Sequence, residues 1–212
     1  WWAEYVGDGE FTFTENIEIP DTLFIGFFAA DIVVIPENVT VKNHGFIIFN
    51  GKVVVEGTLE EYGVLALGEL EGAENVSIER TDYEDGGSMD GEIVYRRGVE
   101  TEEELRSALA EFEKGLPNGY RAEIALFADL ELEDALTVPD SVQLGIWNDE
   151  GTSYSLTVPS LTVYGSVYLE GDLTVTNELQ NHGSIEIADS GALTLGKDGT
   201  YSGYGEISVR DE

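Results

Sequence analysis

The sequence predicts an all-β protein built as a parallel β-helix, a solenoid whose short strands stack coil upon coil. The decapeptide IPDTLFIGFF at Ile19 returns as VPDSVQLGIW at Val138, and Asn-His-Gly occurs at Asn43 and again at Asn181. Between these landmarks, segments of alternating apolar and polar residues are separated by turn residues. Duplication of such a strand and turn unit is typical of solenoid proteins.

Period-two alternation marks the expected strands, because it places every second side chain on one buried face. In chain order these segments are Ile17–Ile19, Val39–Val41, Leu136–Val138, Leu156–Val158, Leu161–Val163, Leu173–Val175, Ile185–Ile187, Leu193–Leu195 and Ile207–Val209. Pro-Asp, Asn-His-Gly and Asp-Gly turns lie between them, and the chain has 25 glycines for such turns. Sandwiches and barrels are the competing all-β folds, but they usually have longer strands joined by hairpins.

One amphipathic helix is expected at about residues 101–114. Thr101 and Glu104 have the spacing of a capping box, in which each side chain accepts a hydrogen bond from the other residue's backbone. Leu105, Ala108, Leu109 and Phe112 form one apolar stripe, and Gly115 follows as a stop signal. We expect this helix to cap the open end of the solenoid that begins near Ala122, where it would cover strand edges.

The duplication and the helix together predict two tandem short units. Residues 1–97 form the first β-helix unit, which ends with an acidic linker loop at 81–91, and residues 98–212 form the helix-capped second unit. Each unit has about the size of a small domain. Acidic residues are spread over both units, which indicates an acidic surface throughout rather than an acidic tail.

A resemblance to a known family supports this fold. From Val99 to Leu144 the chain has a capped helix of the pattern V-x-T-x-x-E-L-x-x-A-L, then L-x-L, then L-T-V-P-x-x-V-x-L. This order resembles the opening of the pectate-lyase-like right-handed β-helix modules of bacterial cell-surface and adhesin-like proteins. The resemblance covers most of residues 98–212 and, more loosely, residues 11–80. It implies a right-handed β-helix and an extracellular location, and it transfers no catalytic motif.

Composition limits the partners. Ten basic residues against 43 acidic ones give a formal net charge of −33. Such a chain would repel nucleic acid, whose binding requires Lys and Arg to neutralise phosphates, and it would repel an anionic membrane. No apolar run is long enough for insertion into a membrane. Neutral glycans and other surface proteins remain as expected partners, and the lack of cysteine excludes disulfides and thiolate chemistry.

The acid-rich loop is the one candidate metal site. Asp82, Glu84, Asp85 and Asp90 could supply oxygen ligands to Ca²⁺, the only cofactor that we consider. The loop lacks the glutamate that an EF-hand requires at its twelfth position. A solvated linker is the alternative interpretation, and the more common one for stretches rich in acids and glycine.

Aromatic residues supply the candidate glycan site. Alternation predicts that Leu161, Val163, Val167 and Leu169 point inward, which leaves Tyr164 and Tyr168 outside as candidate surfaces for stacking on sugar rings. Trp147 aligns with Phe28 in the duplicated decapeptides and is expected to be structural. Both histidines, His44 and His182, lie in the repeated Asn-His-Gly turn, where a structural role is the simpler interpretation.

The sequence therefore predicts a non-catalytic structural or binding module of a bacterial surface protein, located outside the cell. A carbohydrate-active β-helix enzyme is the alternative, because a hydrolase needs only two carboxylates about 5 to 9.5 Å apart. Glu18, Glu131 and Glu186 are outward-facing candidates for such a pair. We expect no enzyme activity, since the chain shows no nucleophile with an adjacent base and orienting group.

Overall fold

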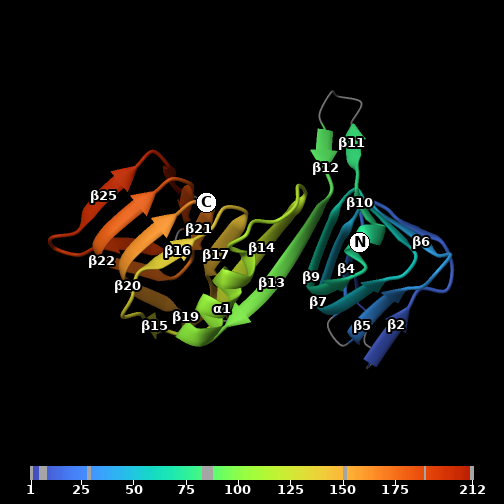
Figure 1. Ribbon diagram of the computed structural model, residues 1–212, viewed down its shortest axis with the longest axis horizontal. Helices are drawn as coiled ribbons and strands as arrows, with labels where there is room; N and C mark the ends of the chain where they lie inside the picture. The colour runs from blue at the N-terminus through green and yellow to red at the C-terminus, as the bar shows by residue number, and fades with distance from the viewer. Residues whose placement is uncertain are drawn as a thin grey trace. The chain divides into compact units, whose positions relative to one another are not determined.

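The computed structural model describes residues 2–4, 9–27, 30–82, 88–149, 152–188 and 190–210. The chain forms two compact units. Unit 1 consists of Trp1–Arg96 and Pro117–Arg121, and unit 2 consists of Arg97–Leu116 and Ala122–Glu212. Each unit is a β-solenoid of parallel strands (Figure 1), so the predicted fold class is confirmed.

Unit 1 contains two parallel sheets that enclose one apolar core. One sheet has the strand order β3-β6-β8-β10, and the other includes the order β1-β4-β7-β9-β13. The strands are β1 (Trp2–Glu4), β2 (Gly9–Thr12), β3 (Ile17–Ile19), β4 (Phe24–Gly26), β5 (Ala30–Ile35), β6 (Thr40–Asn43), β7 (Phe46–Val55), β8 (Thr58–Glu61), β9 (Val64–Glu71), β10 (Val76–Ile78), β11 (Arg80–Asp82), β12 (Ser88–Asp90) and β13 (Glu92–Val99). A short 3-10 helix, η1, spans Ala73–Asn75, and β11 and β12 form an antiparallel hairpin.

Unit 2 stacks successive coils in the same way, and Figure 1 shows β20, β22 and β25 side by side. Its two parallel sheets have the orders β14-β17-β21-β23-β26 and β15-β20-β22-β24. The strands are β14 (Tyr120–Leu126), β15 (Leu130–Glu131), β16 (Leu136–Val138), β17 (Val142–Ile146), β18 (Asn148–Asp149), β19 (Thr152–Ser153), β20 (Ser155–Val163), β21 (Ser166–Leu169), β22 (Asp172–Asn181), β23 (Ser184–Ile187), β24 (Ala192–Leu195), β25 (Thr200–Gly203) and β26 (Glu206–Val209).

The inward column of unit 2 explains its stability. Leu144, Val167 and Ile185 pair in register on successive coils, and each is at most 1% exposed. Burying a side chain of this size contributes about 1.5 to 3 kcal/mol relative to leaving it in water. The predicted inward residues Leu161, Val163, Val167 and Leu169 are all buried, as alternation required.

Three predicted strands differ from the structure, for two local reasons. The segment expected at Val39–Val41 begins one residue later, because Val39 closes a turn by donating its N–H to the carbonyl of Pro36. The two segments expected on either side of Pro159 belong to one strand, β20, whose register shifts between Val158 and Ser160. Proline has no N–H for the ladder, so a bulge at this point lets the strand continue past it.

The duplicated decapeptides build the same turn in both units. Leu23 donates its N–H to the carbonyl of Pro20 at 3.0 Å, and Val142 donates to Pro139 at 3.3 Å. Each turn leads from one parallel sheet into the other. The repeated sequence is therefore a repeated corner of the solenoid.

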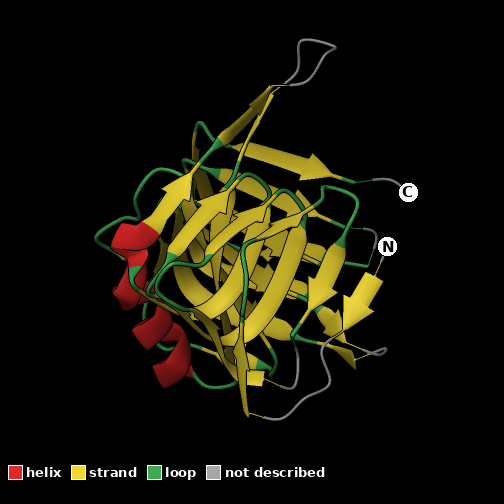
Figure 2. Cartoon of the chain, turned by 90° about the vertical axis from the view of Figure 1, so that its right-hand side faces the viewer, coloured by secondary structure: helices red, strands yellow, loops and turns green. Residues whose placement is uncertain are grey.

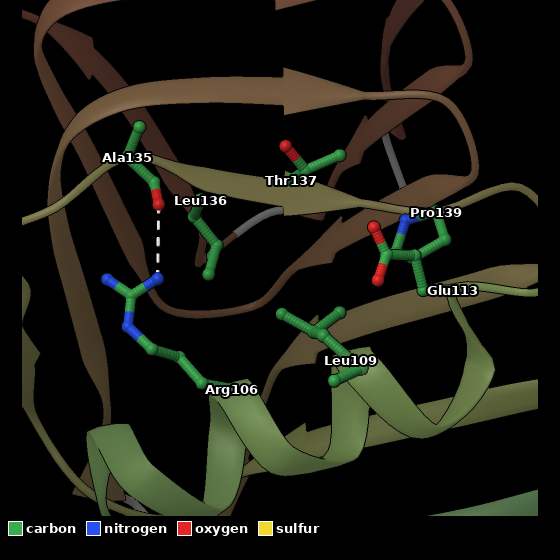
Figure 3. A pocket seen from close by; sticks show the side chains of 8 residues that line it. Arg106, Leu109, Glu113, Ala135, Leu136, Thr137 and Pro139 are labelled. Atoms are coloured by element: carbon green, nitrogen blue, oxygen red, sulfur yellow. Dashed lines mark hydrogen bonds between the residues drawn. The ribbon is translucent and has the colours of Figure 1, made fainter.

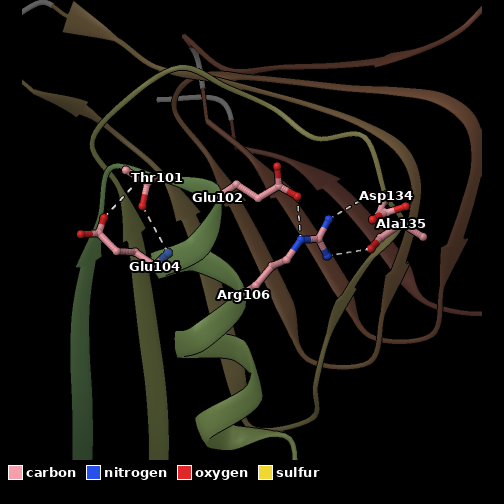
Figure 4. Close-up of polar contacts among 6 residues, drawn as sticks. All are labelled: Thr101, Glu102, Glu104, Arg106, Asp134 and Ala135. Atoms are coloured by element: carbon pink, nitrogen blue, oxygen red, sulfur yellow. Dashed lines mark hydrogen bonds and ion pairs between the residues drawn. The ribbon is translucent and has the colours of Figure 1, made fainter.

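One α-helix, α1 (Glu102–Phe112), is present in the described part of the chain, and Figure 2 shows it outside the strands. Both halves of the predicted capping box are formed (Figure 4): Glu104 donates its N–H to Thr101 Oγ1 at 3.2 Å, and Thr101 donates to Glu104 Oε2 at 3.1 Å. Glu104 Oε2 also accepts the Glu100 N–H at 2.9 Å, and this hydrogen bond, followed by the interactions with Thr101, lowers the pKa of the Glu104 carboxyl.

The helix lies against the first coil of unit 2, as predicted. Its buried side chains are Leu105, Ala108, Leu109 and Phe112. Arg106 fastens it by donating to the backbone carbonyls of Ala135, at 3.1 Å, and Asp134, at 3.2 Å (Figure 4). The helix thus covers the edge of the first coil at Asp134 and Ala135, and it leaves the edge at Thr137 exposed.

Replacing Thr101 by Ala should destabilise unit 2 by about 1 kcal/mol, the usual effect of losing an N-cap. Thermal unfolding, together with hydrogen exchange of the α1 amides, measures the change. The exposed Ser107 in the same helix provides the control, because Ser107→Ala should leave stability unchanged or raise it slightly. Equal stabilities of both variants and the wild type would contradict a capping role for Thr101.

Candidate functional site

An aromatic pair lies on the outer face of unit 2. Trp147 follows β17, and Tyr168 projects outward from β21 on the next coil. Their ring centroids are 4.6 Å apart with an interplanar angle of 40°. Gly145 lies beneath the indole, and a Cβ there would approach Trp147 Nε1 to 2.1 Å. The absence of a side chain at Gly145 is what allows the indole to rest on the strand.

Polar groups border this aromatic pair. The Tyr168 hydroxyl donates to Glu170 Oε1 at 3.2 Å, and the Asn148 backbone N–H donates to Glu170 Oε2 at 3.2 Å. Asn148 Nδ2 also donates to Ser190 Oγ at 2.8 Å. Rings with adjacent carboxylate, amide and hydroxyl groups are the components with which proteins bind sugars and other polar ligands.

The electrostatic setting keeps the Tyr168 hydroxyl protonated. Partial burial raises its pKa, and the neighbouring Glu170 carboxylate raises it further. The hydroxyl is therefore a hydrogen-bond donor. On the next two coils, Glu186 pairs with Arg210 at 3.0 Å between Oε1 and Nε, which adds one cation to an otherwise acidic surface.

Tyr164, the other predicted sugar-stacking residue, lies elsewhere. It stands at the corner before β21 and stacks on His182, with ring centroids 5.3 Å apart and an interplanar angle of 17°. His182 in turn contacts Tyr204 on the following coil at 5.1 Å. Tyr164 and Tyr204 at the two ends of this ladder remain exposed, at 52% and 85%, while His182 lies between them. Tyr164 and Tyr168 thus belong to two different aromatic clusters.

Unit 1 repeats the corner ladder. His44 stacks on Tyr62 at 4.3 Å with an interplanar angle of 17°, and His44 Nε2 lies 3.5 Å from Glu18 Oε1. The two histidines therefore occupy equivalent corner positions. Of the outward carboxylates considered for catalysis, Glu18 faces this histidine, Glu186 is paired with Arg210, and Glu131 is exposed on β15.

The most unusual buried groups were missed in the sequence. Asn43, Glu61 and Asn181 are all 0% exposed at inward positions of the corners. Each accepts a hydrogen bond from the N–H two residues later, at Gly45, Gly63 and Gly183 respectively. The signal was present, because each follows an inward apolar residue by two positions. The sequence predicts a structural turn at Asn-His-Gly, and the structure shows that the asparagine side chain builds this corner.

Glu61 has the most perturbed acidity. Its Oε1 accepts from Asn43 Nδ2 at 2.7 Å and from the Gly63 N–H at 3.1 Å, while Oε2 is buried without a partner among the described residues. Desolvation raises the pKa of this carboxyl to about 8, although the two hydrogen bonds act in the opposite direction. The uncharged form therefore predominates at neutral pH.

The calcium candidates lie at the β11–β12 hairpin. Asp82 ends β11 and Asp90 ends β12, where Asp90 is exposed and pairs in register with Arg80. Glu84 and Asp85 lie outside the described residues. Among the residues that the structure describes, no three His, Asp or Glu side chains come close enough to hold a metal ion. The Ca²⁺ site stays a prediction.

Comparisons with known proteins identify no relative. No family model, curated protein or solved structure matches this chain. Within the described residues, no helix is both long and apolar enough to cross a membrane.

Proposed function

We propose that this chain is a non-catalytic β-helix module of a bacterial cell-surface protein, and that it binds neutral glycans on the outer face of unit 2. The observation that carries the proposal is the Trp147–Tyr168 pair, bordered by the Glu170 carboxylate and by Asn148. Aromatic rings supply contact area for the apolar faces of sugars, and the polar groups bond to hydroxyls.

Charge favours a neutral ligand. The net charge of −33 and the carboxylates beside the aromatic pair would repel an anionic polysaccharide. The same carboxylates accept hydrogen bonds readily from sugar hydroxyls. The resemblance of residues 99–144 to pectate-lyase-like surface modules supports an extracellular location, where such glycans occur.

Replacing Trp147 by Ala should reduce the affinity for a bound glycan about tenfold or more, because a central aromatic residue dominates contacts of this kind. Affinity electrophoresis in gels containing cellulose derivatives, xylan, mannan or mixed-linkage β-glucan identifies the ligand, and calorimetry with its oligosaccharides measures the affinity. Gly145→Ala is a second test, since the added methyl would displace the indole while both aromatic residues remain.

Tyr164→Ala is the matched control, because it removes an exposed tyrosine of unit 2 from the corner ladder and leaves the aromatic pair intact. Unchanged glycan affinity of Trp147→Ala would contradict the proposed site. Release of reducing ends or unsaturated products, abolished by Glu186→Gln, would contradict a non-catalytic role and favour the enzyme alternative.

A further inference from the structure

A groove lies between α1 and the strand β16 of unit 2. Leu109 and Ala110 line it from the helix, and Leu136 and Pro139 line it from the first coil. Its volume is about 260 Å³. Figure 3 shows Leu109 directed toward the strand and Arg106 closing one end of the groove. No residue of the proposed glycan site lines this groove.

The strand beside the groove has one open edge. In the described part of the chain, β16 pairs with β20 alone. The carbonyl of Val138 points toward β20, because it accepts the N–H of Tyr164, the residue that follows β20, at 2.9 Å. Backbone groups of neighbouring residues in a strand point in opposite directions. The N–H and C=O of Thr137 therefore point to the groove.

At one end of this edge, Arg106 makes hydrogen bonds that a neighbouring strand would otherwise make. It donates to the carbonyl of Ala135, which points to the same side as Thr137, and to that of Asp134. Its positive charge is met by Glu102 Oε1 at 2.7 Å. The guanidinium thus provides hydrogen-bond donors for the edge carbonyls of Asp134 and Ala135. The groove begins at the next residues of the strand, which Arg106 does not bind.

The rim of the groove is acidic. Three exposed carboxylates lie on or next to the lining residues: Glu113 lines the groove, Asp134 precedes Ala135, and Asp140 follows Pro139. Against them stand Arg106, whose charge is paired, and the exposed Lys114. A segment with basic residues at either side of an apolar one would match both the rim and the apolar floor.

We propose that this groove binds an extended, cationic segment of a partner protein, which pairs with the open edge of β16 and places an apolar side chain between α1 and the strand. Addition of a strand to an exposed edge gives affinity through backbone hydrogen bonds, and a pocket beside the edge gives specificity. The inference does not depend on glycan binding.

The probe is the peptide Lys-Val-Lys-Val-Lys with an N-terminal fluorescein and a C-terminal amide, and its binding to the whole chain is followed by fluorescence anisotropy. Two changes should each weaken binding about tenfold. The first is N-methylation of both valines of the peptide, which keeps its charge but removes the donors needed for strand pairing. The second is Ala110→Trp, which fills the groove without changing the charge of the protein.

Ser107→Trp provides the control, since Ser107 is an exposed residue of α1 that does not line the groove. The N-methylated peptide tests the proposal on the wild-type protein, so the result stands even if Ala110→Trp does not fold. Equal affinity of both peptides would reduce the interaction to general charge attraction and overturn the proposal, as would no saturable binding up to about 1 mM. A dimer in sedimentation velocity that Ala110→Trp abolishes would overturn it too, because the occupant would then be a second copy.

Discussion

Glu61→Gln should stabilise unit 1 by up to about 3 kcal/mol at pH 7. The pKa of Glu61 is about 8 in the folded chain against an ordinary value of 4.5. Above pH 4.5 the unfolded chain therefore gains stability by losing a proton that the folded chain retains, and folding becomes less favourable by about 1.4 kcal/mol per pH unit until about pH 8. Gln has nearly the same shape and no charge, so it removes this penalty, although burying its amide N–H groups where Oε2 has no partner offsets part of the gain.

The pH dependence of the difference is the decisive measurement. Urea unfolding of the wild type and Glu61→Gln at several pH values, with hydrogen exchange of β6 and β8, should show a small difference near pH 4.5 that grows toward pH 8. The difference between two proteins is informative because the repulsion among the remaining acids largely cancels. A difference that stays constant from pH 4.5 to pH 8 would contradict the raised pKa.

Glu60 is the matched control for this experiment. It precedes Glu61 but faces outward, where hydrogen bonding to Lys42 lowers its pKa, and the oxygen and nitrogen of this ion pair lie 2.6 Å apart. A lowered carboxyl pKa contributes stability that is present above the unfolded value and lost as the pH falls through the folded value. Glu60→Gln should thus change stability in the opposite direction, and only slightly, because the pair is partly exposed to solvent.

Gly183→Ala should destabilise unit 2 by about 3 kcal/mol or more. Substitution of the next residue, Ser184, provides the comparison. A Cβ at Gly183 would lie 1.9 Å from the carbonyl oxygen of Gly165 on the preceding coil. The oxygen belongs to the backbone and the position of a Cβ is fixed by its own backbone, so no side-chain rotation relieves the clash, and the coils must separate. The same close approach recurs in unit 1, where a Cβ at Gly63 would lie 2.1 Å from the Gly45 oxygen.

Thermal and urea unfolding measure this effect, and Ser184→Ala is the control. Ser184 is exposed and begins β23 immediately after the corner. Its replacement should change stability by no more than about 0.5 kcal/mol. Equal midpoints for Gly183→Ala and Ser184→Ala would show that the corner tolerates a methyl group, and that the glycine of Asn-His-Gly has another role.

The two proposals place different partners on unit 2. The Trp147–Tyr168 pair offers half-buried aromatic and acceptor groups to a neutral glycan, whereas the groove beside β16 offers a strand edge and an acidic rim to a basic peptide. Substitutions in one do not alter residues of the other. Their tests can therefore fail independently.

Sequence patterns located the strands best where one face is buried and the other is exposed. Leu173–Val175 and Ile185–Ile187 alternate regularly and lie within strands of the structure. The long strand β7 was missed, because its opening residues Phe46, Ile47, Ile48 and Phe49 are apolar on both faces. A continuous apolar run does not reveal which side chains point inward.

The candidate site was only partly visible in the sequence. Alternation placed Tyr168 outside correctly, but its partner Trp147 comes from the preceding coil, and only stacking of the coils brings the two rings together. The burial of Glu61 was overlooked for a similar reason. In a chain with so many acidic residues, a glutamate is expected on the surface. Only the pairing of β8 with β6 and β10 shows that Glu61 is enclosed.

The sequence by itself determined the solenoid, the repeated corners and the capped helix, because these depend on spacing between residues that are near one another in the chain. The tertiary structure decided which side chains on different coils meet. Parallel stacking brings residues about 20 positions apart to within one strand spacing of about 4.8 Å. That distance, and not any local pattern, forms the aromatic pair and the buried Asn43–Glu61 contact, whereas packing of α1 on the first coil forms the groove beside β16.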